Sequence, residues 1–328
     1  MIGSPGQQLP ILATPQPGSG IGRTADRPSH PASRRSWQNG NAVSLWRLPV
    51  RYLIIGCGHI GTELARRWTS AGHQVTGTTT SPGRVEKLRE ICTDAAVLRG
   101  ADLDAVTRAA EGADAIVLTV SPRLQRSFDA AQRVAEYADT LTASARTAVT
   151  AHPRVVFTSS SSVYGAGEGA LIDEETPTTT DSDASPRNFV AAEQAVLASP
   201  RGAVVRIPDV YGHPDDIDYP TRVKFAHDVL GGSVPFSADA LLYRVDYRDA
   251  AAAIDFVVTQ GLTGVYNAVP DETVPPTNAA AFAEICAAAG LPGLTYRGEI
   301  RTPSVPVTSA KLRAAGFAFS HPAAAPAG

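Results

Sequence analysis

The chain has 328 residues, of which 43% are hydrophobic and 19% charged, a composition typical of a globular protein with one large domain or two smaller ones. The formal net charge of -3 gives no reason to expect a nucleic-acid partner, and no apolar run reaches the ~18 residues of a membrane-spanning helix. The three cysteines show neither metal-ligand spacing nor a disulfide framework, which is typical of the reducing cytoplasm. We therefore expect a cytoplasmic protein that acts on a small molecule.

Residues 1–48 differ in composition from the rest of the chain. They are rich in Pro, Gly, Ser and Arg, Asp26 is their only acidic residue, and they show no helical or strand period. Such a composition does not bury a core, so we expect a disordered tail. A second hypothesis is that the natural chain begins near Leu48.

A strand, a glycine-rich turn and a helix follow one another after this tail. Residues Tyr52 to Ile55 form a bulky apolar run typical of a buried strand, and Thr62 to Ala71 have helical spacing of their apolar residues. The turn between them has the pattern G-x-G-x-x-G: the first glycine permits the sharp turn, the second lets the backbone approach a pyrophosphate, and the third lets the helix pack on the strand. The residues that we expect to contact a dinucleotide here are Gly56, Gly58, His59, Ile60 and Gly61.

Strands and helices alternate from this point to residue 207. We expect strands at His73–Thr78, Ala96–Leu98, Ala115–Val120, Arg154–Thr158 and Ala203–Ile207, with helices at Pro82–Ile91, Asp102–Glu111, Phe128–Val149 and Arg187–Ala198. This alternation predicts an α/β fold of the Rossmann type, a doubly wound parallel sheet. Residues 49–207 are therefore the expected NAD(P)-binding domain.

The chain from residue 208 to residue 320 is richer in proline and less regular. We expect short helices at Thr221–Leu230, Arg248–Thr259, Asn278–Ala289 and Thr308–Ala315, and strands at Leu241–Val245 and Val265–Ala268. This pattern predicts a smaller C-terminal substrate lobe with segments that return to the main sheet. Residues 321–328 are expected to form a short tail.

The stretch after the second expected strand bears on the choice of cofactor. NAD-binding sites usually carry Asp or Glu about 20 residues after the glycines, to bind the ribose 2′-hydroxyl. Residues from Gly77 to Arg84, which include Thr78, contain no carboxylate, so the sequence favours NADP over NAD, with Arg84 as a 2′-phosphate ligand. Arg84 is alternatively a solvated residue, and Asp102 either faces the adenine or caps a helix.

Seven segments in the second half resemble one family in their order. They are SSSSVYG (159–165), DEETP (173–177), AAEQAVL (191–197), RIPDVYGHP (206–214), RVDYRDAA (244–251), VYNAV (265–269) and SAKLRAAGF (309–317). Together with the glycine turn they resemble the extended short-chain dehydrogenase/reductase family, the NAD(P)-dependent sugar-nucleotide epimerases and dehydratases. The single residue between the first two glycines is similar to the atypical members.

The resemblance implies oxidoreductase or epimerase chemistry on a small carbonyl, hydroxyl or sugar-like substrate. The nicotinamide is then expected beside Thr119, Val120, Ser160 and Pro208. The family often pairs through long helices, so Phe128–Val149 is the expected contact of a homodimer.

Catalysis is where the chain departs from the family, which uses a Tyr and a Lys four residues apart on a helix. Alignment places Ser185 and Phe189 at these positions, and neither transfers the proton. By the resemblance Ser160 binds the substrate oxygen; alternatively its hydroxyl satisfies the backbone at the end of a strand. Tyr164 is the second catalytic candidate, although it also fits packing beside the site, and Tyr211 and Tyr219 are further possible acids.

The missing pair keeps a second function open, a sensor or scaffold that binds NAD(P) without turnover. A hydroxyacid or imine dehydrogenase also fits the turn but requires a different second lobe. The histidines His59, His213 and His227 show no metal-ligand spacing, so we expect no metal, and His59 is expected to point outward.

Overall fold

The computed structural model describes residues 49–123, 129–181 and 183–321. The expected tail over 1–48 lies outside the described residues, as do 322–328 of the second tail. Among the described residues, no helix is both long and apolar enough to cross a membrane.

The centre of the molecule is a seven-stranded sheet in the order β10-β6-β5-β4-β1-β2-β3. All neighbouring strands pair in parallel. The strands are β1 (Arg51–Ile55), β2 (Gln74–Thr79), β3 (Asp94–Val97), β4 (Ala115–Leu118), β5 (Val155–Ser160), β6 (Ala203–Ile207) and β10 (Gly264–Asn267). This arrangement confirms the predicted doubly wound, Rossmann-like α/β fold.

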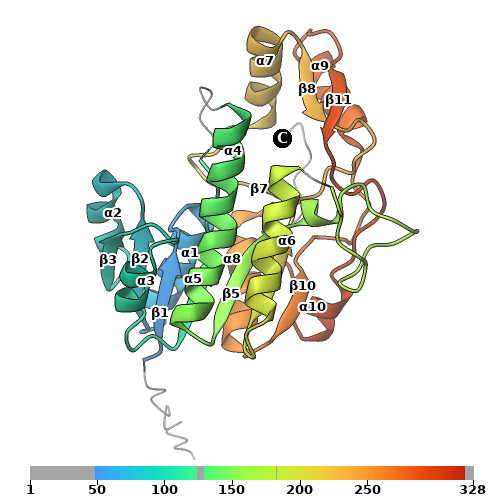
Figure 1. The fold of residues 1–328 in the computed structure, drawn as a ribbon. Coiled ribbons are helices and arrows are strands. Elements are labelled where there is room, and N and C mark those ends of the chain that lie inside the picture. The colour runs from blue at the N-terminus through green and yellow to red at the C-terminus, as the bar shows by residue number, and fades with distance from the viewer. Residues whose placement is uncertain (1–48, 124–128, 182, 322–328) are drawn as a thin grey trace, which may run out of the picture. The chain divides into compact units, whose positions relative to one another are not determined.

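Helices cover both faces of the sheet, because alternate residues of each strand point to opposite faces. Tyr52 and Ile54 of β1 pack with one set of helices: α1 (His59–Ser70), α2 (Val85–Arg89), α8 (Tyr247–Thr259) and α10 (Ala310–Ala314). Leu53 and Ile55 pack with the other set: α3 (Leu103–Ala109), α5 (Ser144–Ala151) and α6 (Ala184–Leu197). In Figure 1, α5 and α6 lie in front of the sheet and α8 lies behind it.

Two of the expected helices are less regular than predicted. The helix predicted over Phe128–Val149 consists of α4 (Ala130–Tyr137), a π-helical segment (Ala138–Ala143) and α5, while Phe128 lies outside the described residues. A capping box fixes its start, because Asp129 accepts from the N–H of Gln132 at 2.8 Å and Gln132 accepts in return. The helix predicted over Pro82–Ile91 begins instead as a single 3₁₀ turn (Pro82–Arg84) before α2.

The last third of the chain adds two small two-stranded sheets, which the sequence predicted only in part. Strand β7 (Asp209–Tyr211) pairs with β9 (Arg244–Asp246), and β8 (Ser233–Phe236) pairs with β11 (Thr295–Ile300). Helices α7 (Tyr219–Leu230) and α9 (Asn278–Ala288) share an apolar cluster. Figure 1 shows α7, β8, α9 and β11 together at the top of the view.

Candidate functional site

The three glycines between β1 and α1 have three different environments. Gly56 has a φ of 96°, which a side chain disfavours. A Cβ on Gly58 would meet no atom within 4 Å, whereas a Cβ on Gly61 would lie 2.6 Å from the Thr119 hydroxyl and 2.8 Å from the Gly56 carbonyl. Helix α1 starts at His59, three residues before the predicted start, so the end of the turn forms its first helical turn.

Hydrogen bonds from three neighbouring segments hold this loop. The Gly56 N–H donates to the Thr78 hydroxyl at 3.2 Å, and the Thr119 hydroxyl donates to the Gly56 carbonyl at 2.7 Å. The Arg84 guanidinium donates to the Cys57 carbonyl at 2.9 Å. At the N-terminus of α1, Gly58 is the N-cap and has no side chain, and the first turn carries no acid. The positive end of the helix is therefore left for an anionic ligand.

A cavity of about 470 Å³ opens beside the loop. Three arginines line it: Arg84, Arg99 and Arg123. Arg123 donates to the Ser81 hydroxyl at 2.8 Å, and Arg99 forms an ion pair with Asp139. Among the described residues, its lining also includes Gly56, Cys57, Gly58, Thr79, Thr80, Gly100, Thr119, Val120, Ser121, Glu136, Asp139, Thr140 and Ser144.

A second cavity of about 500 Å³ adjoins the first, and the two share residues Thr119, Val120 and Ser121 after β4. Its walls come from the ends of β5 and β6, where Ser160 and Pro208 lie, and from α7, β8 and α9. Most of the lining is apolar, including Ile60, Phe189, Val223, Phe236, Leu241 and Phe282. A dinucleotide that crosses the shared segment therefore reaches both cavities.

The structure brings most, but not all, of the predicted cofactor residues to these cavities. Gly56, Gly58 and Arg84 line the smaller cavity, Ile60 and Pro208 line the larger one, and Thr119 and Val120 line both. Two supporting residues lie beneath the loop: Thr78, which is 1% exposed, and Gly61. Two others line neither cavity. Asp102 caps α3 through a 3.0 Å bond from the Ala105 N–H. His59 is exposed, as expected, and its ring stacks on His213.

The two predicted catalytic residues have different surroundings. Ser160 lines the larger cavity, and its hydroxyl accepts the Ser162 N–H at 3.1 Å, which is the expected backbone role; binding of a substrate oxygen stays a prediction. Tyr164 lines neither cavity. Its buried hydroxyl lies 2.8 Å from the Asn267 side-chain oxygen and accepts from Arg206 at 2.8 Å. Burial is the main reason that the pKa of Tyr164 is raised.

A buried ion pair lies beneath the larger cavity and joins β5, β6 and α6. Arg206 donates to both carboxylate oxygens of Glu193, at 3.0 and 2.7 Å, and Ser159 donates to the same carboxylate at 2.6 Å. Burial alone would lower the pKa of Arg206, but the bonds to Glu193 outweigh this and raise it. The network fixes the backbone that carries Ser160.

A tyrosine–carboxylate pair in the larger cavity was not singled out by the sequence. The Tyr219 hydroxyl donates to the Asp209 carboxylate, and both residues line the cavity. Burial and the charge of Asp209 raise the pKa of Tyr219 well above its ordinary value. The guanidinium of Arg244 lies 4.4 Å from the Tyr219 ring centre, and Arg222 lies 3.6 Å from Asp209. A weak signal existed, because Asp209 lies two residues after the end of the sixth strand.

The fold is similar to those of solved enzymes at low sequence identity. WbmG of Bordetella bronchiseptica, in complex with NAD and UDP, has a TM-score of 0.64 and 19% identity, over 83% of this chain and 90% of that chain. The dTDP-glucose 4,6-dehydratase DesIV of Streptomyces venezuelae, with NAD and TYD bound, has a TM-score of 0.62 and 18% identity, over 83% and 93% of the two chains.

Sequence comparison identifies both a relative and a family. Protein YeeZ of Escherichia coli is 36% identical over 136 residues, and the match spans 38% of this chain and 45% of that protein, less than half its length. The model of the NAD dependent epimerase/dehydratase family matches residues 52–268, which confirms the resemblance seen in the motifs. Because this match extends over more than half of the 328 residues, the chain belongs to the NAD dependent epimerase/dehydratase family.

Proposed function

We propose that the protein transfers hydride between a nicotinamide dinucleotide and a sugar-like hydroxyl or carbonyl, as an epimerase or dehydratase of nucleotide-linked sugars. The observation that carries this proposal is the pair of cavities joined at Thr119, Val120 and Ser121. With the pyrophosphate at the glycine loop, the nicotinamide reaches the larger cavity beside Ser160 and Pro208. Residues 208–320 supply much of the remaining wall and act, in this proposal, as the substrate lobe.

Proton transfer in this proposal uses Tyr219 and Asp209. The family positions of Tyr and Lys are held by Ser185 and Phe189, and the Phe189 ring lines the cavity instead. The raised pKa of Tyr219 keeps its hydroxyl protonated at neutral pH. Its single O–H proton, which is bonded to Asp209 in this structure, turns to a substrate oxygen and is donated there when a carbonyl is reduced. Ser160 supplies the second hydrogen bond to the same oxygen. We therefore assign the acid to Tyr219 rather than to Tyr164.

NADP is the preferred cofactor in this proposal. Ser81, Arg84 and Arg123 gather at the end of β2, where NAD-binding relatives of this fold usually place a carboxylate. Two guanidinium groups there favour a 2′-phosphate.

Calorimetric titration with NADPH and with NADH tests this preference. Arg123→Ala should weaken the binding of NADPH by about tenfold or more, because a charge-assisted hydrogen bond contributes about 1.5–3 kcal/mol. The binding of NADH, which has no 2′-phosphate, should be unchanged. Arg89→Ala, in the exposed Glu86 pair of α2, is the control. Equal weakening of NADPH and NADH binding would contradict the proposed preference for NADP.

The catalytic proposal is tested with purified protein, each coenzyme and a panel of nucleotide sugars. Product is followed by mass spectrometry, and hydride movement by deuterium at the nicotinamide C4. Epimerised or dehydrated product with label transfer supports the proposal. Tight dinucleotide binding without turnover of any panel member would favour the sensor or scaffold instead.

We also propose a homodimer through α4. Ala131 is exposed and Val134 is 39% exposed, so this helix presents small apolar side chains to solvent in the single chain. Light scattering should give twice the 34.3 kDa chain mass, and Val134→Arg should return the protein to a monomer. A monomeric wild-type protein would contradict the dimer.

A further inference from the structure

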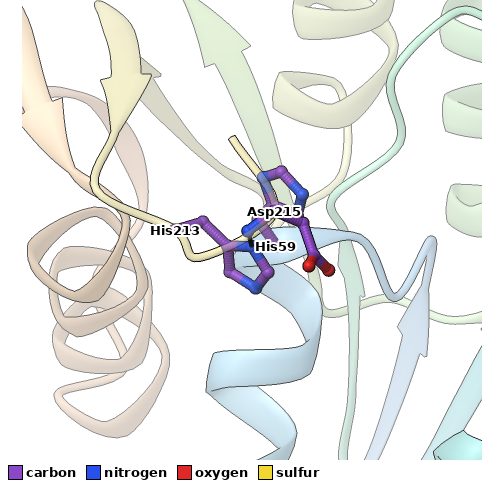
Figure 2. Close-up of side chains that lie close together, drawn as sticks. All are labelled: His59, His213 and Asp215. Carbon is purple, nitrogen blue, oxygen red and sulfur yellow. Dashed lines mark hydrogen bonds between the residues drawn. The ribbon is translucent and has the colours of Figure 1, made fainter. Parts of the chain in front are cut away.

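Three side chains from two distant segments converge beside the glycine loop. His59 is the first residue of α1, and His213 and Asp215 lie in the loop that follows β7. One ligand atom from each residue lies within 4.8 Å of the other two. Figure 2 shows the two imidazoles face to face, with the Asp215 carboxylate beside them. Neither of the two cavities described above includes these residues.

The two imidazole rings are stacked, with their centres 3.8 Å apart and an angle of 5° between their planes. Two protonated imidazoles at this distance would repel each other. The neutral imidazole is the form that binds metal ions.

The ligand atoms are mostly uncommitted within the described part of the chain. The neighbouring Asp216 is engaged, because it accepts from Arg222 at 2.9 Å, but no hydrogen bond from the described residues holds the Asp215 carboxylate or the His59 ring. His213 accepts the Asp215 N–H through Nδ1 at 3.1 Å, so Nε2 is the ring nitrogen left for a metal ion.

We propose that His59, His213 and Asp215 bind one divalent transition-metal ion of the Zn²⁺, Co²⁺ or Ni²⁺ class. Two imidazoles and one carboxylate match the ligand preference of these ions, whereas Mg²⁺ and Ca²⁺ prefer oxygen ligands. Water completes the coordination, because His59 and Asp215 are exposed.

Binding requires a small local rearrangement. The lone pairs of two stacked imidazoles lie in parallel planes, so one ring must turn to direct its nitrogen at a common ion. His59 is the exposed partner and is therefore the ring that turns. Metal–ligand bonds of about 2.0–2.1 Å then hold the three ligand atoms, which already lie within 4.8 Å of one another, around one ion. The bound ion would tie the β7–α7 loop to the N-terminus of α1.

Titration of the full chain with Co²⁺, followed by visible absorption, and with Zn²⁺, followed by calorimetry, tests the site without any dinucleotide or substrate. We expect one ion per chain and ligand-field bands in the visible region. His213→Ala and Asp215→Asn should each weaken binding by roughly 10- to 100-fold or more, the range seen when the support of a metal site is removed. His152→Ala, which removes an imidazole far along the chain, should bind like the wild type.

Thermal unfolding of each variant without metal checks that the fold is intact. We expect little change in the unfolding temperature, because the His213 side chain is half-buried and that of Asp215 is exposed. Wild-type protein that binds no ion, or His213→Ala and Asp215→Asn variants that bind as well as His152→Ala, would overturn the proposal. Because the titration contains no coenzyme, its failure leaves the proposed hydride transfer untouched, and failure of hydride transfer leaves the metal site untouched.

Discussion

Gly61 and Thr119 lie so close together that a Cβ on Gly61 would come within 2.6 Å of the Thr119 hydroxyl. The same hydroxyl donates to the Gly56 carbonyl at 2.7 Å, so one threonine holds both ends of the glycine turn. The close approach sets α1 against the ends of β1 and β4. Gly58, in contrast, faces open space, so the loop combines a tightly packed base with an unobstructed surface.

Gly61→Ala should destabilise the protein. Overpacking typically lowers the free energy of unfolding by about 1–3 kcal/mol. Replacing a helical glycine with alanine raises it by about 0.5–1 kcal/mol, because the unfolded chain loses conformational freedom. The net loss in the free energy of unfolding should therefore be about 1–2 kcal/mol, measured by urea denaturation. An unchanged midpoint would show that α1 shifts without cost and that the close packing is not required.

Removal of Glu193 should be more costly, because it leaves Arg206 as an unpaired charge. The two side chains are 3% and 5% exposed. Glu193→Ala should lower the free energy of unfolding by about 3–5 kcal/mol. Glu86→Ala, which removes the exposed pair with Arg89, is the control and should cost about 1 kcal/mol or less. Equal losses in the two variants would contradict the structural role of the buried pair.

The pH dependence of stability should report on Asp271. Burial alone raises the pKa of this carboxyl, but bonds from Arg313, the Ser309 N–H and the Thr308 hydroxyl outweigh burial and hold it below the ordinary 3.8. A lowered pKa in the folded state stabilises the protein above 3.8, and this contribution is lost as the pH falls through the folded value. Asp271→Asn should thus destabilise the protein at neutral pH. The difference in free energy of unfolding between variant and wild type, measured by urea denaturation, should shrink below pH 3.8. A difference independent of pH would contradict this assignment.

Tyr219→Phe should lower kcat of the proposed reaction by about 10²–10⁴, the usual contribution of a general acid. Tyr164→Phe is the comparison, since its ring lines neither cavity; it should reduce stability through lost hydrogen bonds and leave kcat nearly unchanged. Because the pKa of Tyr219 is raised, activity should not fall as the pH passes the ordinary tyrosine value of 10.0. If kcat fell in Tyr164→Phe and not in Tyr219→Phe, Tyr164 rather than Tyr219 would be the general acid.

The parts of the fold that follow from local pattern were predictable from sequence. Strand β6 has the predicted bounds, Ala203–Ile207, because it is buried along its whole length and is apolar except for Arg206. Strands β7, β8 and β11 were not predicted: they are short, partly exposed and paired only within two-stranded sheets. Their stability depends on contacts between distant segments, which periodicity does not reveal.

The same distinction applies to the candidate site. The glycine loop is contiguous and carries its own spacing, so sequence alone located it. The larger cavity is assembled from segments between Ile60 and Pro303, and its Tyr219–Asp209 pair depends on how α7 folds back over the end of β6. The stack of His59 on His213 joins residues 154 positions apart, a contact that no motif spacing encodes.

Calorimetric titration of wild-type protein and Gly58→Val with NADPH and NADH tests the central claim most directly. Gly58 has a φ of -84°, and a Cβ there meets no atom, so the variant should fold and unfold thermally much like the wild type. Wild-type protein should bind one dinucleotide per chain and Gly58→Val should bind none, because its side chain occupies the place of the pyrophosphate. Unchanged affinity in Gly58→Val, or no saturable heat with the wild type, would contradict the account.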